Sequence, residues 1–153
     1  MSDNNAEMIT IENYKEKIES YNSMFSALCL INQNNPAKLG IHDNKLYKCW
    51  NTFSGLQRTY YGENRDTLIE FLENNFSMFC DFYNKLFVLL NENRNNGLIH
   101  ELATTIEVTR INMNHWCSGL RGLQQNYPED EDFNGKINTI ISSLTTLQSK
   151  KIM

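Results

Sequence analysis

The chain has 153 residues, of which 41% are hydrophobic, and it carries a formal net charge of −4. A chain of this length can bury one sizeable core without help from a disulfide or a metal ion. Because the balance is acidic and the Lys and Arg residues are scattered, the sequence lacks the basic stripe that phosphate backbones require, and we expect no nucleic-acid partner.

The sequence also argues against a membrane or secretory destination. No apolar run approaches the ~18 residues that a membrane-spanning helix needs. Residues 1–5 hold neither the basic region nor the apolar stretch of a secretory leader. We therefore expect no membrane span and an intracellular location, in the cytoplasm or the nucleus.

The four cysteines stand alone at wide spacings, as Cys29, Cys49, Cys80 and Cys117. Zinc sites usually carry close Cys-x-x-Cys pairs, and this sequence has none. The cysteines are therefore interpreted as reduced core thiols, and we expect neither a metal nor another cofactor.

Helix breakers are few, since the chain has two prolines and seven glycines. An all-β chain would show turn signals every 8–12 residues, so the long uninterrupted segments favour helices. The sequence predicts an all-α bundle of about five helices, with a disordered N-terminus over residues 1–9 and one domain over residues 10–150.

The first predicted helix covers about residues 10–32, with Thr10 as its N-cap and Pro36 beyond its end. Its apolar residues recur every three or four positions, which places them on one side of a helix. They are Ile11, Tyr14, Ile18, Tyr21, Phe25 and Leu28.

A second helix is predicted from about Asp43 or Asn44, after a loop through Gly40, to Tyr61 and Gly62. The third, over residues 65–92, has two apolar stripes side by side and is expected to form the centre of the core. The first stripe holds Leu68, Leu72, Phe76, Phe79, Tyr83, Leu86 and Leu90; the second holds Phe71, Met78, Phe82 and Leu89.

A fourth helix is predicted over residues 98–126 and a fifth over residues 130–149. Within the fourth, residues 104–111 are rich in β-branched side chains, which leaves a strand open as an alternative. The flanking periodicity favours a helix throughout. The acidic run at residues 129–132 is interpreted as a solvated helix start, where negative charge is favourable.

Two stretches of the chain repeat each other. Residues 55–60 read Gly-Leu-Gln-Arg-Thr-Tyr and residues 122–127 read Gly-Leu-Gln-Gln-Asn-Tyr, and Trp50 and Trp116 precede them. The repeat indicates two duplicated αα-hairpins behind an N-terminal helix. The glycines Gly55, Gly119 and Gly122 are expected either to admit a neighbouring backbone or to end their helices.

Over residues 50–60 and 116–127 the chain resembles short uncharacterised Asn-rich helical proteins of large DNA viruses. The sequence holds 22 asparagines, in keeping with that resemblance. The resemblance implies a viral protein that acts inside a host cell, and it carries no functional residue over.

No motif for catalysis is present. The sequence lacks a phosphate loop, a Gly-x-Ser-x-Gly elbow, a His-Glu-x-x-His motif and the Glu-x-x-His pairs of metal-binding bundles. His115, beside Trp116, is the best single candidate for a functional histidine, against the alternative of a hydrogen-bonded structural one. We expect a protein that is not an enzyme.

The surplus of aromatic residues instead favours an interaction or structural protein that binds a protein partner or its own copy. One alternative is a host-modulating binder that holds a peptide helix in a groove, loosely as Bcl-2 proteins do. Another is an enzyme or small-ligand binder with a pocket near Trp50 and Trp116. The candidate interaction surface comprises Phe71, Met78, Phe82, Leu89, Trp50, His115 and Trp116.

Overall fold

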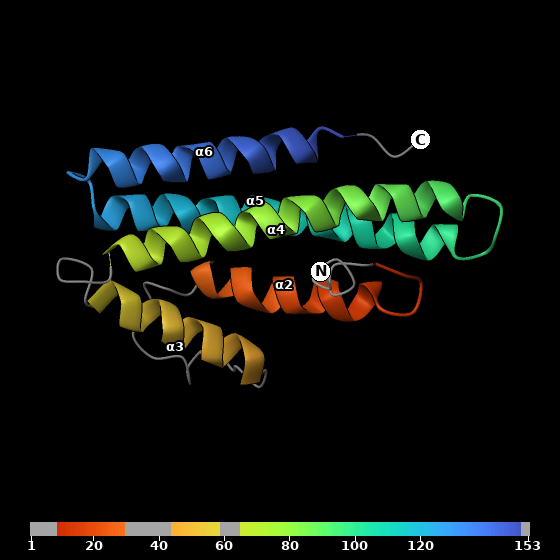
Figure 1. Ribbon diagram of the computed structural model, residues 1–153, viewed down its shortest axis with the longest axis horizontal. Coiled ribbons are helices and arrows are strands. Elements are labelled where there is room, and N and C mark those ends of the chain that lie inside the picture. The colour runs from red at the N-terminus through yellow and green to blue at the C-terminus, as the bar shows by residue number, and fades with distance from the viewer. Residues whose placement is uncertain (1–8, 30–43, 59–64, 151–153) are drawn as a thin grey trace, which may run out of the picture.

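The computed structural model describes residues 9–29, 44–58 and 65–150 (Figure 1). These residues form five helices and no strand, so the predicted all-α fold is confirmed. The helices are α2 (Tyr14–Cys29), α3 (Asn44–Arg58), α4 (Arg65–Glu92), α5 (Ile99–Asn126) and α6 (Glu131–Gln148).

The predicted bounds hold most closely where the apolar periodicity is strongest. Helix α4 begins and ends at the predicted residues, and residues 104–111 are helical throughout, which rules out the strand alternative. The predictions for residues 1–8, Pro36, Gly40, Asp43, and Tyr61 and Gly62 lie outside the described residues.

The first helix starts later than predicted, although its cap is where the sequence placed it. The Asn13 N–H donates to Thr10 Oγ1 (3.2 Å), and the Thr10 N–H donates to Asn13 Oδ1 (2.9 Å). This reciprocal pair is a capping box in which Asn takes the place of the usual Glu or Gln. The two bonds satisfy the backbone N–H groups of Thr10 and Asn13, and regular helix follows from Tyr14.

The helices stack in layers (Figure 1). Helices α4 and α5 form the middle layer, and α6 packs against both of them. Helix α2 packs on α5 from the other side, and its rings contact those of α4. Helix α3 lies outermost, against α2 and the beginning of α4. The middle layer is therefore covered on two sides, which explains the wide apolar arc of α4.

Ring contacts fix the direction of α2. Tyr21 contacts Phe82 (5.2 Å between centroids), whereas Phe25 contacts Phe76 (4.0 Å), so α2 and α4 run antiparallel. Phe25 also meets Trp116 at 4.9 Å. Hydrogen bonds join Tyr14 to Glu101 and Asn22 to Asn112. The α5 partners thus follow one another in the same direction as the α2 residues, so α2 and α5 run parallel.

One hydrophobic core collects buried residues from all five helices. Trp116 lies at its centre with no exposed surface, between the rings of Phe25 and Phe79. Its Nε1 is buried and has no hydrogen-bond partner among the described residues, which costs about 1–3 kcal/mol. The packing of so large a ring offsets that cost.

Gly119 allows α2 and α5 to approach closely, as one of the two readings of the sequence expects. A β-carbon at this position would lie 3.0 Å from the carbonyl carbon of Leu28 and 3.1 Å from the amide nitrogen of Cys29. The missing side chain therefore lets the last turn of α2 settle on α5.

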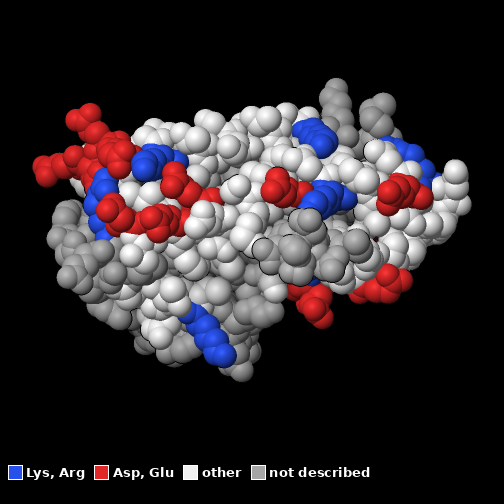
Figure 2. All heavy atoms as spheres, in the orientation of Figure 1, with Lys and Arg blue, Asp and Glu red and all other residues white. Residues whose placement is uncertain are grey.

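Charged side chains tie the beginnings of α4 and α6 together. Arg65 donates to both carboxylate oxygens of Asp130, at 2.6 and 2.9 Å, and to Asp132 at 2.9 Å. Asp130 also caps α6, since its Oδ1 accepts the Phe133 N–H at 3.0 Å. Figure 2 shows acidic and basic groups gathered at this end of the molecule. The acidic run is thus a helix start, as predicted, but half of it is ion-paired.

Candidate functional site

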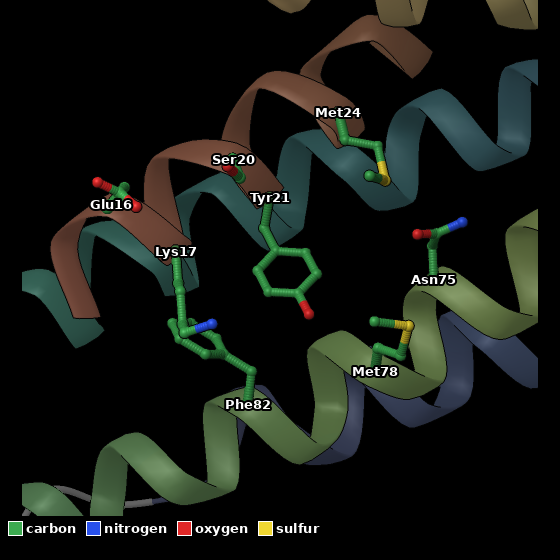
Figure 3. A pocket seen from close by; sticks show the side chains of 8 residues that line it. All are labelled: Glu16, Lys17, Ser20, Tyr21, Met24, Asn75, Met78 and Phe82. Atoms are coloured by element: carbon green, nitrogen blue, oxygen red, sulfur yellow. The ribbon is translucent and has the colours of Figure 1, made fainter. Parts of the chain in front are cut away.

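A groove runs between α2 and α4 and has a volume of about 350 Å³ (Figure 3). Its apolar lining comes from four side chains, two on each helix. Tyr21 and Met24 belong to α2, and Met78 and Phe82 belong to α4. We call these four residues the groove floor.

The ring of Tyr21 is held in place by its neighbours in the core. It lies 5.8 Å from Phe25, 5.4 Å from Phe79 and 5.2 Å from Phe82, measured between ring centroids. The two aromatic side chains of the floor are therefore fixed by packing. The thioethers of Met24 and Met78 are unbranched, and they can adapt to the shape of whatever enters.

Polar side chains line the edge of the groove, as Glu16, Lys17, Ser20 and Asn75. The Asn75 Nδ2 donates to the carbonyl oxygen of Phe71 at 2.7 Å, so its amide is anchored to its own helix. In Figure 3, Lys17 and Phe82 lie toward one end of the groove, whereas Met24, Met78 and Asn75 lie toward the other. An apolar floor with a polar edge is the usual composition of a recognition site.

Met78 is the most exposed member of the floor, with 43% of its surface accessible. On α4 it stands at the margin of the buried side, next to positions that α2 covers. Its exposed apolar surface faces water, and removing apolar surface from water is favourable by about 25 cal/mol per Å². Covering it is a source of binding free energy.

The structure does not bring the predicted interaction surface together in one place. Met78 and Phe82 line the groove, although Phe82 itself is almost buried. Phe71 is half-buried and packs edge-on against Phe53 of α3, at 5.4 Å. Leu89 is buried in the core. The second stripe of α4 is therefore mostly covered from inside the molecule.

The other three residues of the predicted interaction surface, Trp116, Trp50 and His115, lie outside the groove. Trp116 has no exposed surface, so placing it on an interaction surface is wrong. Trp50 is half-buried against the core. His115 is exposed, on a side of α5 away from the groove. Its carbonyl oxygen accepts from the Cys29 thiol at 3.1 Å, which is a backbone role.

The sequence missed Tyr21 and Met24 as members of the site. Tyr21 was assigned to the apolar stripe of its helix, and Met24 lies one position before that stripe reaches Phe25. Their roles depend on how far α2 sits from α4, which periodicity does not report.

The described residues contain no group of three His, Cys, Asp or Glu side chains that could hold a metal ion. The four cysteines are free thiols. The prediction of core positions holds only for Cys117, which is buried; Cys49 and Cys80 are half-buried, and Cys29 is exposed, so the prediction is wrong for Cys29.

Loss of water around the sulfur atom raises the pKa of the Cys29, Cys80 and Cys117 thiols above the ordinary value of 9.0, and Asp81 raises that of Cys80 further. Cys29 is exposed as a residue, but its sulfur is turned toward the His115 carbonyl oxygen. Thiols with raised pKa values are poor nucleophiles at neutral pH.

A second cleft, of about 310 Å³, lies between α4 and α6. Phe76, Cys80 and Ile140 give it an apolar base, and Glu73, Asp81 and Lys136 stand at its edge. Lys136 is engaged with Asp132 at 4.0 Å. Neither this cleft nor the α2–α4 groove is lined by Trp50 or Trp116, around which the sequence suggested a ligand pocket.

Within the described parts of the chain, no helix combines the length and the apolar character that crossing a bilayer requires. No protein-family model, no curated protein and no solved structure matches this chain.

Proposed function

We propose that this chain is a non-enzymatic interaction protein, which receives a helix of a protein partner or of its own copy in the α2–α4 groove. The observation that carries the proposal is the groove floor itself. Four large apolar side chains border a space of about 350 Å³, and one of them, Met78, remains 43% exposed. Open apolar surface of this kind on a soluble domain commonly marks a binding site.

The shape of the groove favours a helix over an extended strand. Its two walls are themselves helices, so no sheet edge offers backbone groups to a strand. A partner helix would present apolar residues three or four positions apart, which is the spacing that amphipathic helices use. Methionines in the floor suit such a partner, because they repack around different side chains.

The host-modulating version of this proposal rests on the resemblance to viral proteins alone. It keeps the predicted mode of binding, in which the third helix of the sequence forms part of the groove. The same surface would serve a structural role if the occupant were another copy of the chain.

Site-specific photo-crosslinking tests the proposal. A photoreactive phenylalanine analogue replaces Ser20 at the edge of the groove or, as a control, Ser142 on the exposed side of α6. We expect the probe at position 20, and not at position 142, to capture a protein in native cells. Adding Met78→Glu should abolish that capture. Equal capture at both positions, or capture that survives Met78→Glu, would contradict the proposal.

A further inference from the structure

Two asparagines in the chain are followed directly by glycine. Asn96 precedes Gly97, and Asn134 precedes Gly135. The side-chain amide of an asparagine can react with the backbone nitrogen of the next residue, and glycine obstructs this approach least because it has no β-carbon. The same pair thus occurs twice, and its chemistry depends on what surrounds each copy.

The first pair lies in the turn that joins α4 to α5 (Figure 1), and both of its residues are exposed. Among the described residues, the Gly97 N–H donates no hydrogen bond. A β-carbon on Gly97 would meet nothing within 4 Å. The Gly97 nitrogen is therefore accessible and is not held by the bond that a helix would impose.

Hydrogen bonds fold the Asn96 side chain back toward the next peptide unit. Its Oδ1 accepts the Leu98 N–H at 2.8 Å, which closes an Asx-turn, a ring of atoms that includes the Gly97 nitrogen. Its Nδ2 donates to Asn93 Oδ1 at 2.7 Å. A donor at Oδ1 polarises the amide and stabilises the negative charge that develops on this oxygen when a nucleophile attacks the amide carbon.

The second pair has surroundings of the opposite kind. Gly135 lies inside α6, where a regular helix bonds the N–H to the carbonyl oxygen four residues earlier. The Asn134 Nδ2 donates to the Tyr127 carbonyl oxygen at 3.0 Å, and the Asn134 Oδ1 is buried. Attack by the Gly135 nitrogen would therefore require the beginning of α6 to open.

We infer that Asn96 is a site of spontaneous deamidation in the folded protein, whereas Asn134 is protected by its helix. Hydroxide removes the proton of the Gly97 N–H, and the nitrogen then bonds to Cγ of Asn96. The bond from Cγ to Nδ2 breaks, and ammonia leaves with a proton taken from water. The resulting cyclic imide takes up one water molecule at either of its carbonyl carbons, which gives aspartate or isoaspartate at position 96.

The product changes the beginning of α5. A carboxylate at position 96 keeps an acceptor for the Leu98 N–H and adds a negative charge near the positive end of the helix dipole, but it can no longer donate to Asn93. Isoaspartate also inserts a methylene group into the main chain of the turn. The modification therefore acts on the connection between the two helices of the middle layer, and it is independent of the groove.

Peptide mapping by mass spectrometry tests the inference on the whole protein, incubated at neutral and mildly alkaline pH and sampled over time. We expect the acid to accumulate at position 96, faster at the higher pH because more of the Gly97 nitrogen is deprotonated, while position 134 stays an amide. The same incubation in urea should let both positions react, because unfolding removes the protection by α6 and raises the rate at position 134 about tenfold or more.

Two glycine variants form a matched pair. Gly97→Ala adds a β-carbon that has room in the folded protein, so the fold should be kept, but the methyl group obstructs the attack and should slow deamidation of Asn96 about tenfold. Gly135→Ala adds a β-carbon that also meets nothing within 4 Å and should leave the rate at Asn96 unchanged. Circular dichroism establishes that both variants are folded.

Three results would overturn the inference. One is a rate at position 96 that is no higher than the rate at position 134 in the folded protein. Another is Gly97→Ala reacting as fast as the wild type. The third is a product that contains aspartate but no isoaspartate, because opening of the cyclic imide gives both.

Discussion

At Gly119 the end of α2 rests on α5, and the added methyl group of Gly119→Ala would lie 3.0 Å from both the carbonyl carbon and the β-carbon of Leu28. Alanine favours a helix over glycine by about 1 kcal/mol, but the clash involves backbone that cannot simply rotate away. We expect Gly119→Ala to lower the free energy of unfolding by about 1–3 kcal/mol, in the range of overpacked cores. Urea denaturation followed by circular dichroism measures it.

Gly135 provides the matched control, because a β-carbon there meets nothing within 4 Å and the residue lies inside α6. Gly135→Ala should leave stability unchanged or raise it by up to about 1 kcal/mol. If both substitutions stabilise the protein, the two helices are not held as closely as described.

At the scale of whole elements, Asp130 joins α6 to α4. It accepts two hydrogen bonds from Arg65 and caps α6, and its side chain is only 18% exposed. Asp130→Ala removes the cap and leaves Arg65 with fewer partners, so we expect a loss of about 1–3 kcal/mol in unfolding free energy.

Asp132 serves as the comparison, since it contacts the same Arg65 but is 60% exposed and caps nothing. Exposed ion pairs contribute little, so Asp132→Ala should cost under about 1 kcal/mol. Thermal melts of the two variants measure the difference in stability. Equal losses of stability would mean that the ion pairs with Arg65, and not the cap of α6, supply the stability.

The beginning of α2 is tied to α5 by Glu101, which accepts from the Tyr14 hydroxyl (3.0 Å) and pairs with Lys15. Lys15, followed by the Tyr14 hydroxyl, lowers the pKa of Glu101 below the ordinary value of 4.5. A lowered folded pKa stabilises the protein above the unfolded value, and this contribution is lost as the pH falls through the folded value.

Replacing Glu101 by Gln therefore has an effect that depends on pH. We expect Glu101→Gln to be less stable than the wild type at neutral pH, with the difference shrinking below the ordinary pKa of 4.5 and vanishing in stronger acid. Denaturation curves at several pH values measure the difference. A gap of constant size over the whole range would show that the carboxylate charge plays no part.

Much of the element structure could be predicted from the sequence, because burial follows periodicity. Two apolar stripes on one helix predicted α4 and its central place; the first stripe is fully buried, and Phe82 and Leu89 of the second are buried with it. The turn before α2 shows the limit, since Thr10 is the cap that the sequence predicts, whereas regular helix begins only at Tyr14, after a turn at residues 11–13.

The site was less predictable, because exposure depends on the distance between helices. Nothing in the second stripe of α4 distinguishes Met78 from Phe82 and Leu89, yet only Met78 stays open to solvent. Likewise, the β-branched residues at 104–111 left a strand open as an alternative to the predicted helix, and in the structure Val108 and Ile111 are exposed apolar residues of that helix. The duplication of the hairpins stays a prediction.

At the scale of the whole molecule, the layered arrangement accounts for both exposed apolar surfaces. Helices α2 and α6 cover the middle layer from two sides, but α2 leaves a groove along α4, and Val108 and Ile111 of α5 stay exposed. The fold thus buries one large core and leaves apolar surface exposed in the groove and on α5. The proposed binding of other molecules depends on these exposed apolar surfaces, and first of all on the groove.

Methyl NMR of methionine tests that claim most directly, because the chain carries its own probes and its own control. Met24 and Met78 line the groove, whereas Met113 has no exposed surface. As protein concentration or a captured partner is raised, we predict that the Met24 and Met78 methyl signals shift and broaden while that of Met113 stays in place. Unchanged Met24 and Met78 signals under conditions where the protein demonstrably associates would show that the groove is not the binding surface.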